Sequence, residues 1–308
     1  MGRKRKGDPI HGWLIVDKPA GLSSSAVVGK VRRIFNAAKA GHGGTLDPLA
    51  TGILPIAFGE ATKTVSYAMD GIKSYSFTVR WGESRTTDDA EGDVVQTSDI
   101  RPDAAAIQAA LPAFVGDIQQ VPPIYSAIKV DGKRSYELAR NDQAVELKAR
   151  TIHVEKFELL DMPDADHATF SVVSGKGTYV RGLARDLALK LGTFGYISVL
   201  RRTRVGPFDE KAAISLDILE SLGHSAPPVD SLLAVETVLD DIPALALTGQ
   251  EARSLQQGQP VAVLPVANRS SLGKVNPDAV YRAMADGKLI ALTKITGGAV
   301  RPLRVFNL

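Results

Sequence analysis

The sequence predicts an α+β fold, in which a large domain is built around a mixed, largely antiparallel sheet and a small β-rich domain follows it. Strand-like and helical stretches mix along the first 240 residues without the regular βαβ rhythm of a parallel sheet. Beyond residues 240–243 the pattern changes to a short helix and several short strands. A chain of 308 residues is long enough for one large and one small domain.

The large domain begins with an apolar run at residues 12–16, which predicts a short strand. Ser23 and the two serines after it can cap a helix that extends to about Phe35, because apolar residues at helical spacing give this segment one buried face. The next elements are predicted from the same patterns: a strand at 53–58, a helix from about 61 to 69 and an alternating strand at 75–79.

The rest of the large domain alternates between strand-like and helical patterns. Strands are expected at 123–130, 151–160, 168–174 and 196–205, and helices at 103–111, 134–140 and 179–191. The expected organisation is therefore a basic tail at 1–9, a large domain at 10–240 and a small domain at 243–308.

The composition excludes several kinds of chemistry. The chain has no cysteine, which excludes disulfides, thiolate zinc sites and cysteine nucleophiles, and its five histidines leave few imidazole metal sites. We expect a site built from carboxylates, hydroxyls and cations. No apolar run approaches the roughly 20 residues of a membrane helix. Because the basic residues 3–6 precede no apolar segment, we expect a protein that is not exported and works in the cytoplasm.

The net charge of +3 is unevenly distributed along the chain. Residues 1–80 carry twelve Lys and Arg against five Asp and Glu, whereas residues 81–120 carry two against eight. A segregated positive field suits a polyanionic partner, but a basic surface also serves solubility, so charge alone does not decide for nucleic acid. The acidic run at 86–93 has neither the glycine nor the acidic spacing of an EF-hand loop, and we expect it to be a solvated hairpin.

Residues 41–52 contain four glycines, His42 and Asp47 between two apolar strands. Glycines allow a close backbone approach, and Pro48 biases Asp47 toward an extended conformation, so this loop would present the carboxylate rigidly. An ordinary turn with Asp47 as a local cap is the competing interpretation. The segment lacks the Lys-Ser/Thr ending of a P-loop, which argues against a phosphate cradle.

The loop reads Gly-His-Gly-Gly-Thr-Leu-Asp-Pro-Leu-Ala-Thr-Gly and is followed by Gly-Glu-Ala-Thr-Lys at 59–63. Together these motifs resemble the catalytic motif of the TruB family of pseudouridine synthases. In that family the aspartate of the motif is the nucleophile, so the resemblance assigns this role to Asp47. It also implies that His42 enters the T-loop of tRNA, where the target base has left.

The resemblance continues in the elements at 16–24, 73–75 and 175–181, and in Leu-Arg-Arg-Thr at 200–203. It implies the following roles: Tyr75 stacks on the flipped uracil, Arg181 pairs with Asp47, Tyr179 and Leu200 line the pocket, and Lys18 and Lys63 either contact phosphates or hold the loops. Several cations are expected as a group to contact phosphates, namely Arg32, Arg33, Lys129, Lys133, Arg134, Arg201, Arg202 and Arg204.

The activity that the resemblance implies is conversion of the T-loop uridine of tRNA, usually numbered 55, to pseudouridine. This reaction breaks the N1–C1′ bond and joins C5 to the ribose, and it needs a nucleophile, a base platform and exclusion of water but no metal or cofactor. A cation beside Asp47 would favour the ionised carboxylate. Unstacking the base costs a few kcal/mol, of which stacking on Tyr75 returns about 1–3 kcal/mol.

The resemblance also implies an insertion at about 121–150 that grips the T-arm and a PUA-like RNA-binding domain at 243–308. We expect a monomer. A role as a tRNA folding chaperone can accompany catalysis. The main alternative is a tRNA-binding or folding protein without catalysis, for which Asp47 would be dispensable. Within the enzyme class, a ribosomal-RNA enzyme is the nearest competitor, and the insertion argues against it.

Overall fold

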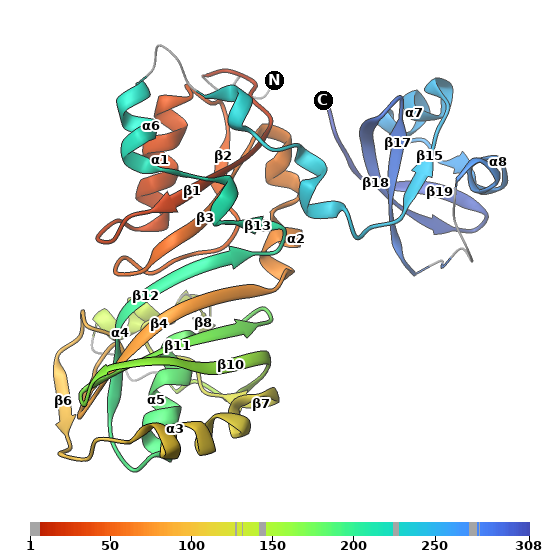
Figure 1. Cartoon of the computed structure of the whole chain (residues 1–308). Helices are drawn as coiled ribbons and strands as arrows, with labels where there is room; N and C mark the ends of the chain where they lie inside the picture. Colours follow the sequence, from red (N-terminus) through yellow and green to blue (C-terminus); the bar gives the residue numbers. More distant parts are fainter. Residues whose placement is uncertain are drawn as a thin grey trace.

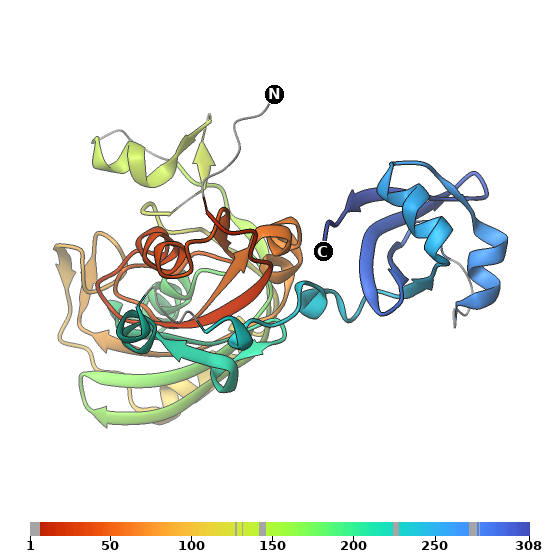
Figure 2. The ribbon, with the colours of Figure 1, turned by 90° about the horizontal axis from the view of Figure 1, so that it is seen from above.

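The computed structural model describes residues 7–126, 128–130, 132–141, 146–223, 228–270, 276 and 278–308. Within these residues the chain forms a ten-stranded sheet and a separate five-stranded sheet, which lie side by side (Figures 1 and 2). Both sheets carry helices, so the predicted α+β class is confirmed. None of the described helices is long and apolar enough to span a membrane.

The large sheet has the strand order β14-β1-β3-β12-β4-β11-β10-β7, with β2 paired to β3 and β13 paired to β12. Only the pairs β1–β14 and β3–β12 are parallel, so the sheet is mixed and largely antiparallel, as predicted. Its strands are β1 (Gly12–Lys18), β2 (Ala40–His42), β3 (Thr51–Phe58), β4 (Lys73–Trp81), β7 (Gly116–Gln120), β10 (Arg150–Asp164), β11 (His167–Ser174), β12 (Gly195–Val205), β13 (Phe208–Asp209) and β14 (Ala213–Ser215).

Two small hairpins accompany the large sheet. The first pairs β5 (Glu83–Arg85) with β6 (Val94–Thr97), and the second pairs β8 (Lys129–Val130) with β9 (Lys133–Arg134). The second hairpin and the helix after it stand away from the sheet, in yellow-green in Figure 2. Residues 127, 131 and 142–145 of the predicted insertion, and residues 1–6 of the predicted tail, lie outside the described part of the chain.

The helices of the large unit cover different parts of its sheet. α1 packs against α6 and β2, whereas α5 contacts β12 and α3 contacts β10 (Figure 1). The sequence explains α1, because the Ser23 hydroxyl accepts from the Ala26 amide and Val27, Val31 and Ile34 form its buried face. The helices are α1 (Ser24–Ile34), α2 (Val65–Asp70), α3 (Ala104–Ala110), α4 (Ser135–Arg140), α5 (Val180–Lys190) and α6 (Leu216–Leu222). Single 3₁₀ turns lie at η1 (Gly59–Lys63), η2 (Leu111–Phe114), η3 (Glu210–Ala212), η4 (Val229–Ser231) and η5 (Val235–Leu239).

The five-stranded sheet has the order β15-β17-β18-β19-β16 and its own apolar core. Thr248 and Glu251 form a capping box at the start of its first helix, which explains where that helix begins. Its elements are β15 (Ala244–Ala246), α7 (Gly249–Gln256), β16 (Val261–Ala262), α8 (Val263–Arg269), β17 (Val280–Ala285), β18 (Lys288–Thr296) and β19 (Ala299–Val305).

The two sheets share one apolar cluster. Phe306, Leu289 and Leu292 from the C-terminal sheet pack in the same cluster as Trp13 and Ile15 from the large sheet. All five side chains are at most 3% exposed. The C-terminal unit is therefore seated on the large one through buried contacts and not merely tethered to it.

Most predicted elements are present within a few residues, but three predictions were wrong. The strand expected at 123–130 is reduced to β8, because Pro122 and Pro123 supply no backbone donors and a turn follows them. The helix expected from about 61 to 69 is interrupted at Thr64, where a 3₁₀ turn ends and α2 begins. The C-terminal unit has two helices among its described residues, where one was expected.

Candidate active site

The loop at 41–52 runs from β2 to β3 and is fixed along its whole length. The Ser24 hydroxyl donates to the Leu46 carbonyl at 2.9 Å and accepts from the Leu46 amide at 2.8 Å. The Gly43 amide donates to the Pro55 carbonyl at 2.7 Å, and the Gly21 amide donates to the Pro48 carbonyl at 2.8 Å. Asp47 therefore projects from a backbone that is pinned on both sides.

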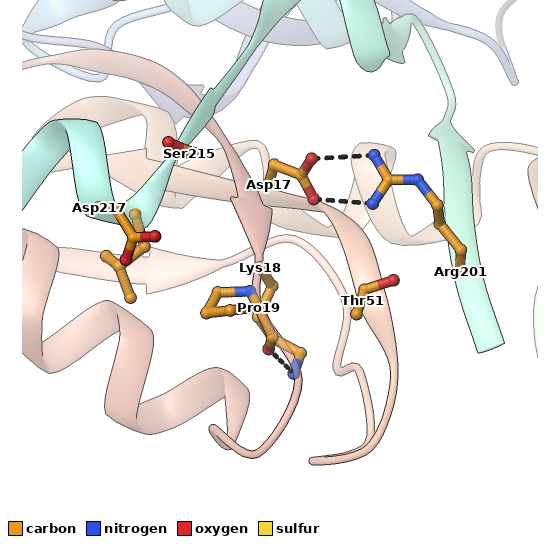
Figure 3. Close-up of a pocket in the computed structure, with 8 residues that line it drawn as sticks. Asp17, Lys18, Pro19, Thr51, Arg201, Ser215 and Asp217 are labelled. Atoms are coloured by element: carbon orange, nitrogen blue, oxygen red, sulfur yellow. Dashed lines mark hydrogen bonds and ion pairs between the residues drawn. The ribbon is translucent and has the colours of Figure 1, made fainter. Parts of the chain in front are cut away.

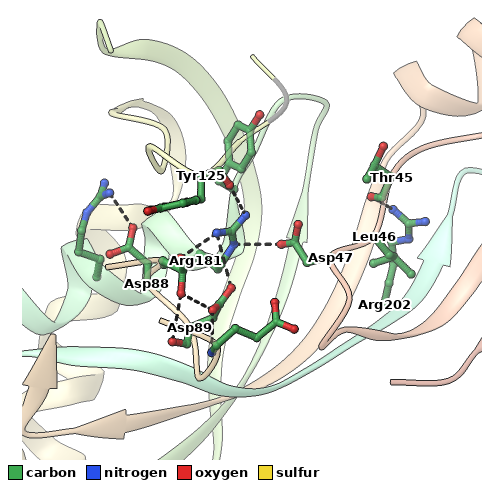
Figure 4. Close-up of polar contacts among 12 residues, drawn as sticks. Thr45, Leu46, Asp47, Asp88, Asp89, Tyr125, Arg181 and Arg202 are labelled. Atoms are coloured by element: carbon green, nitrogen blue, oxygen red, sulfur yellow. Dashed lines mark hydrogen bonds and ion pairs between the residues drawn. The ribbon is translucent and has the colours of Figure 1, made fainter. Parts of the chain in front are cut away.

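Arg202 lies beneath this loop and is 2% exposed. Its guanidinium donates to the carbonyls of Ile53 and Gly44 at 2.8 and 3.0 Å, and to the carbonyl of Thr45 at 3.2 Å, the contact drawn in Figure 4. A Cβ at Gly52 would lie 2.2 Å from the Arg202 carbonyl oxygen, so only glycine fits there. Our expectation that Arg202 contacts phosphates was wrong, because a guanidinium that is buried and bound to three carbonyls is not available to RNA.

Lys18 holds the same loop from the end of β1. Its ammonium group donates to the carbonyls of Pro19, Leu22 and Pro48 at 2.8, 2.8 and 3.1 Å, and the residue is fully buried. Burial lowers the pKa of Lys18 to about 8, although the Asp47 carboxylate opposes this shift. Of the two roles considered for Lys18, the geometry supports holding the loops and contradicts contact with phosphate.

Asp47 and Arg181 form the central ion pair of the site. The Arg181 Nε lies 2.9 Å from the Asp47 carboxylate, whose side chain is 34% exposed, whereas the Arg181 side chain is 5% exposed (Figure 4). The remaining guanidinium nitrogens donate to the carbonyls of Thr87 and Tyr125 at 2.7 and 2.9 Å. A fixed cation thus faces a carboxylate that remains open on one side.

A second carboxylate supports the same arginine from the acidic run at 86–93. Asp89 lies 3.5 Å from the Arg181 Nη1 and is 2% exposed; it also accepts from the Glu91 amide and the Thr87 hydroxyl. Its neighbour Asp88 bonds Arg185 at 3.0 Å, and burial raises the pKa of Asp88. The prediction of a solvated hairpin was wrong in one respect: the run lies between β5 and β6, but Asp88 and Asp89 are turned inward onto the arginines of α5.

Three other predicted residues lie on the strands and the helix that carry Arg202 and Arg181, or beside them. Tyr75 lies on β4 opposite Arg202 of β12. Burial lowers the pKa of Arg202, and the Tyr75 hydroxyl partly opposes this lowering. Leu200 lies two residues before Arg202 on β12 and is 5% exposed. Tyr179 is the N-cap residue of α5; burial raises the pKa of its phenol, and Arg181 and Asp47 contribute to its electrostatic environment.

The remaining two predicted residues have different surroundings. His42 ends β2, and within the described residues its Nδ1 has no hydrogen-bond partner. Burial, followed by the Arg202 cation, lowers the pKa of His42, so its imidazole is neutral at pH 7. Lys63 instead reaches the C-terminal sheet, where it donates to the Val305 carbonyl at 2.8 Å and pairs with Glu60. Its geometry favours a holding role between the two sheets.

Among the other expected phosphate contacts, Arg201 forms a two-bond ion pair with Asp17 at 3.0 and 2.9 Å. The pair lines a cavity of about 240 Å³ at the ends of β1 and β3 (Figure 3). Asp47, Tyr75 and Arg181 are not among its lining residues, so this cavity is distinct from the ion-paired site. The side chains of Lys129 and Arg134 lie outside the described part of the structure. No cluster of three or more His, Asp or Glu side chains suited to a metal ion is present among the described residues.

Four positioning side chains were not predicted: Ser24, Arg202 in this role, Asp89 and Gln120. Gln120 is 1% exposed, and its amide bonds both the backbone amide and the carbonyl of Tyr179. The sequence held one indication of Asp89: residues 81–120 carry an excess of acidic residues, and this segment supplies the carboxylates that pair with the arginines of α5.

The chain is similar to known proteins over its whole length. Residues 32–180 match the model of the TruB family pseudouridylate synthase N-terminal domain, and residues 181–240 match the tRNA pseudouridylate synthase B C-terminal domain. It is 58% identical to the tRNA pseudouridine synthase B of Rhodospirillum rubrum and 51% identical to that of Caulobacter vibrioides, with 100% of each chain covered. A solved Cbf5–Nop10–Gar1 complex contains a chain with a TM-score of 0.73 and 27% identity, covering 96% of this chain and 84% of that one.

Proposed function

The chain belongs to the TruB family of pseudouridylate synthases, and from this membership we propose that it forms pseudouridine in tRNA, at the T-loop uridine usually numbered 55. The observation that carries this proposal is the pair of Asp47 and Arg181. A partly exposed carboxylate beside a buried arginine, whose other nitrogens donate to backbone carbonyls, can serve as a nucleophile or a base.

In the proposed reaction Asp47 acts on the flipped uridine so that the N1–C1′ bond breaks and a C5–C1′ bond forms; C5 then loses its hydrogen as a proton, and N1 takes up a proton. Arg181 orients Asp47, because its Nε is directed at the carboxylate while its other nitrogens are occupied by backbone carbonyls. No redox step is required, since the product is an isomer of the substrate.

The base must first leave its stack in the RNA. Tyr75, half-buried on β4, is suited to stack on the extruded uracil, and Leu200 and Tyr179 close the pocket around it. A neutral His42 fits the task of filling the vacated place in the T-loop, because an uncharged ring stacks among bases without the cost of desolvating a charge.

We further propose that the stretch at about 121–150 grips the T-arm and that residues 243–308 form a PUA-like RNA-binding domain. The projecting β8–β9–α4 segment and the separate five-stranded sheet support these assignments. We propose a monomer in the cytoplasm, and a second role in tRNA folding that uses the same surface.

The test is release of tritium from tRNA labelled with [5-³H]uridine, measured for the wild type and for Asp47→Asn, with tRNA binding measured in parallel. The wild type is expected to release one tritium per tRNA, and the variant to bind tRNA but release none. The exposed Asp99→Asn is the matched control and retains wild-type release. Binding without release by the wild type would favour the non-catalytic tRNA-binding alternative.

A further inference from the structure

Gln120 is a buried polar side chain that the proposed reaction does not use. It ends β7, and its amide group makes two hydrogen bonds to one residue: Nε2 donates to the Tyr179 carbonyl at 3.0 Å, and the Tyr179 amide donates to Oε1 at 2.9 Å. The Gln120 amide thus makes the same two bonds, one donated and one accepted, that a residue of an antiparallel strand exchanges with the residue opposite it. Because this side chain is 1% exposed and both ends of its amide are bonded, its orientation is restricted.

These bonds act at the start of α5. Tyr179 is the N-cap residue of that helix, and its side chain provides no cap. Gln120 instead fixes the Tyr179 backbone, whose carbonyl also accepts the first helical bond from Leu183 at 3.1 Å. Because Arg181 lies only two residues further on, the direction of its side chain depends on how this first turn is held.

The segment after Gln120 is attached to α5 at further points. Arg185 donates to the Val121 carbonyl at 2.7 Å, and Arg181 donates to the Tyr125 carbonyl at 2.9 Å. This segment leads directly into β8, β9 and α4. Gln120 is therefore the point at which the large sheet, the projecting hairpin and the start of α5 meet.

We infer that Gln120 is a positioning residue for the isomerisation: by holding the backbone of Tyr179, it sets the geometry of Arg181 against Asp47. This inference rests on the proposed roles of Asp47, Tyr179 and Arg181. Gln120 touches no reacting atom itself. Its effect passes through the Tyr179 backbone to Arg181, so we expect it to change the rate of the chemical step and not the affinity for tRNA.

The surroundings of Gln120 leave it little freedom. A Cβ at Gly182 would lie 3.0 Å from the Gln120 Nε2 and 3.1 Å from its Cδ, which is tighter than ordinary contact. Glycine at this position thus leaves room for the amide to reach Tyr179. Gly182→Ala would press on the amide from the helix side, and it would not weaken α5, since alanine favours helix more than glycine does.

The experiment compares Gln120→Met with wild type in single-turnover tritium release from labelled tRNA. Methionine has nearly the same shape but makes neither hydrogen bond. At a temperature at which both proteins are folded, the rate constant is expected to fall about 10- to 100-fold, because small misplacements of a catalytic group have effects of this size. The Kd for tRNA is expected to stay within about twofold. The matched control is Gln119→Met, since Gln119 is exposed on the same strand and bonds only Thr151 among the described contacts.

Gly182→Ala is the second variant. It is expected to lower the single-turnover rate constant about threefold in the wild-type protein and to cause no further loss when combined with Gln120→Met. If Gln120→Met does not fold, the rate constant of Gly182→Ala alone tests the inference. A Gln120→Met rate constant equal to that of wild type despite a lower Tm, or a loss confined to Kd, would overturn the inference. If wild type released no tritium, the proposed function would fail and this inference with it; normal wild-type release with unaffected variants would overturn the inference alone.

Discussion

The carboxylate of Asp89 lies 3.5 Å from Nη1 of Arg181, whose Nε faces Asp47, and the Asp89 side chain is 3% exposed. Arg181 therefore pairs with two carboxylates, one buried and one partly exposed. Because Asp89 is buried, we expect it to hold the arginine independently of any bound RNA.

Asp89→Asn is expected to lower the single-turnover rate constant about 10- to 100-fold while tRNA binding persists. The amide keeps the size of the carboxylate but removes the charge that holds Arg181, so the guanidinium is free to shift toward Asp47. Single-turnover tritium release with parallel binding measures both quantities. Asp93→Asn, exposed in the same segment, is the control, and an Asp89→Asn rate equal to wild type would show that Arg181 is held by the two carbonyls alone.

Arg202→Lys is expected to reduce the free energy of unfolding by about 2–3 kcal/mol, because a lysine cannot bond three carbonyls in the fork geometry and leaves buried acceptors without partners. Urea denaturation followed by circular dichroism measures this loss. Arg204→Lys is the control: this arginine is exposed and donates to the nearby Gly206 carbonyl, so a change within about 0.5 kcal/mol is expected. Equal free energies of unfolding for the two variants would contradict a stabilising role for the bonds of Arg202 to the three carbonyls.

Lys18 predicts a dependence of stability on pH. Its pKa is about 8 in the folded protein and 10.5 when unfolded, so between these values the unfolded chain binds the additional proton and stability rises with pH. The advantage of wild type over Lys18→Met is therefore expected to grow from pH 8 to pH 10.5, by at most about 3 kcal/mol. The exposed Lys190→Met would show no such trend against wild type. A difference between wild type and Lys18→Met that falls or stays constant over this range would count against the assignment.

The contact between the two sheets predicts local protection. Glu60 accepts from the Asn307 amide at 2.8 Å, and Lys63 bonds Glu60 and the Val305 carbonyl. Lys63→Met is expected to speed hydrogen exchange of the Asn307 amide about tenfold, since a loss of about 1.4 kcal/mol opens this end of the chain. Exchange followed by mass spectrometry checks this, with the exposed Lys30→Met as control. Unchanged exchange in Lys63→Met would mean that the apolar cluster alone seats the sheet.

The elements that the sequence predicted well are those whose signal is local. The helix after Ser23 has its cap and its apolar face within a dozen residues, and β4, β11 and β12 show their alternation directly. The strand expected at 123–130 was a wrong prediction, because arginines of α5 bond the carbonyls of Val121 and Tyr125 and hold this segment in a turn. These contacts join segments that are distant in the sequence, so the local pattern does not reveal them.

The same distinction applies to the candidate site. The loop around Asp47 was identifiable from its glycines and its motif, and the resemblance paired it with Arg181. What the sequence could not show is which charges are buried: Asp89, Arg202 and Lys18 resemble surface residues until the fold buries Arg202 and Lys18 against the loop and Asp89 against Arg181. Burial is a property of the assembled sheet, and no short window of sequence contains it.

The bonds from Arg202 to Gly44 and Thr45 join residues that are 158 and 157 positions apart in the chain. During synthesis on the ribosome, the loop with Asp47 emerges early, yet its clamp is translated only after α5 and most of β12. At ordinary elongation rates this interval is roughly 10 to 30 seconds. The nascent chain therefore carries Asp47 in an unfinished loop during about half of its synthesis, and this loop is completed late, when the twelfth strand is inserted between the third and the fourth.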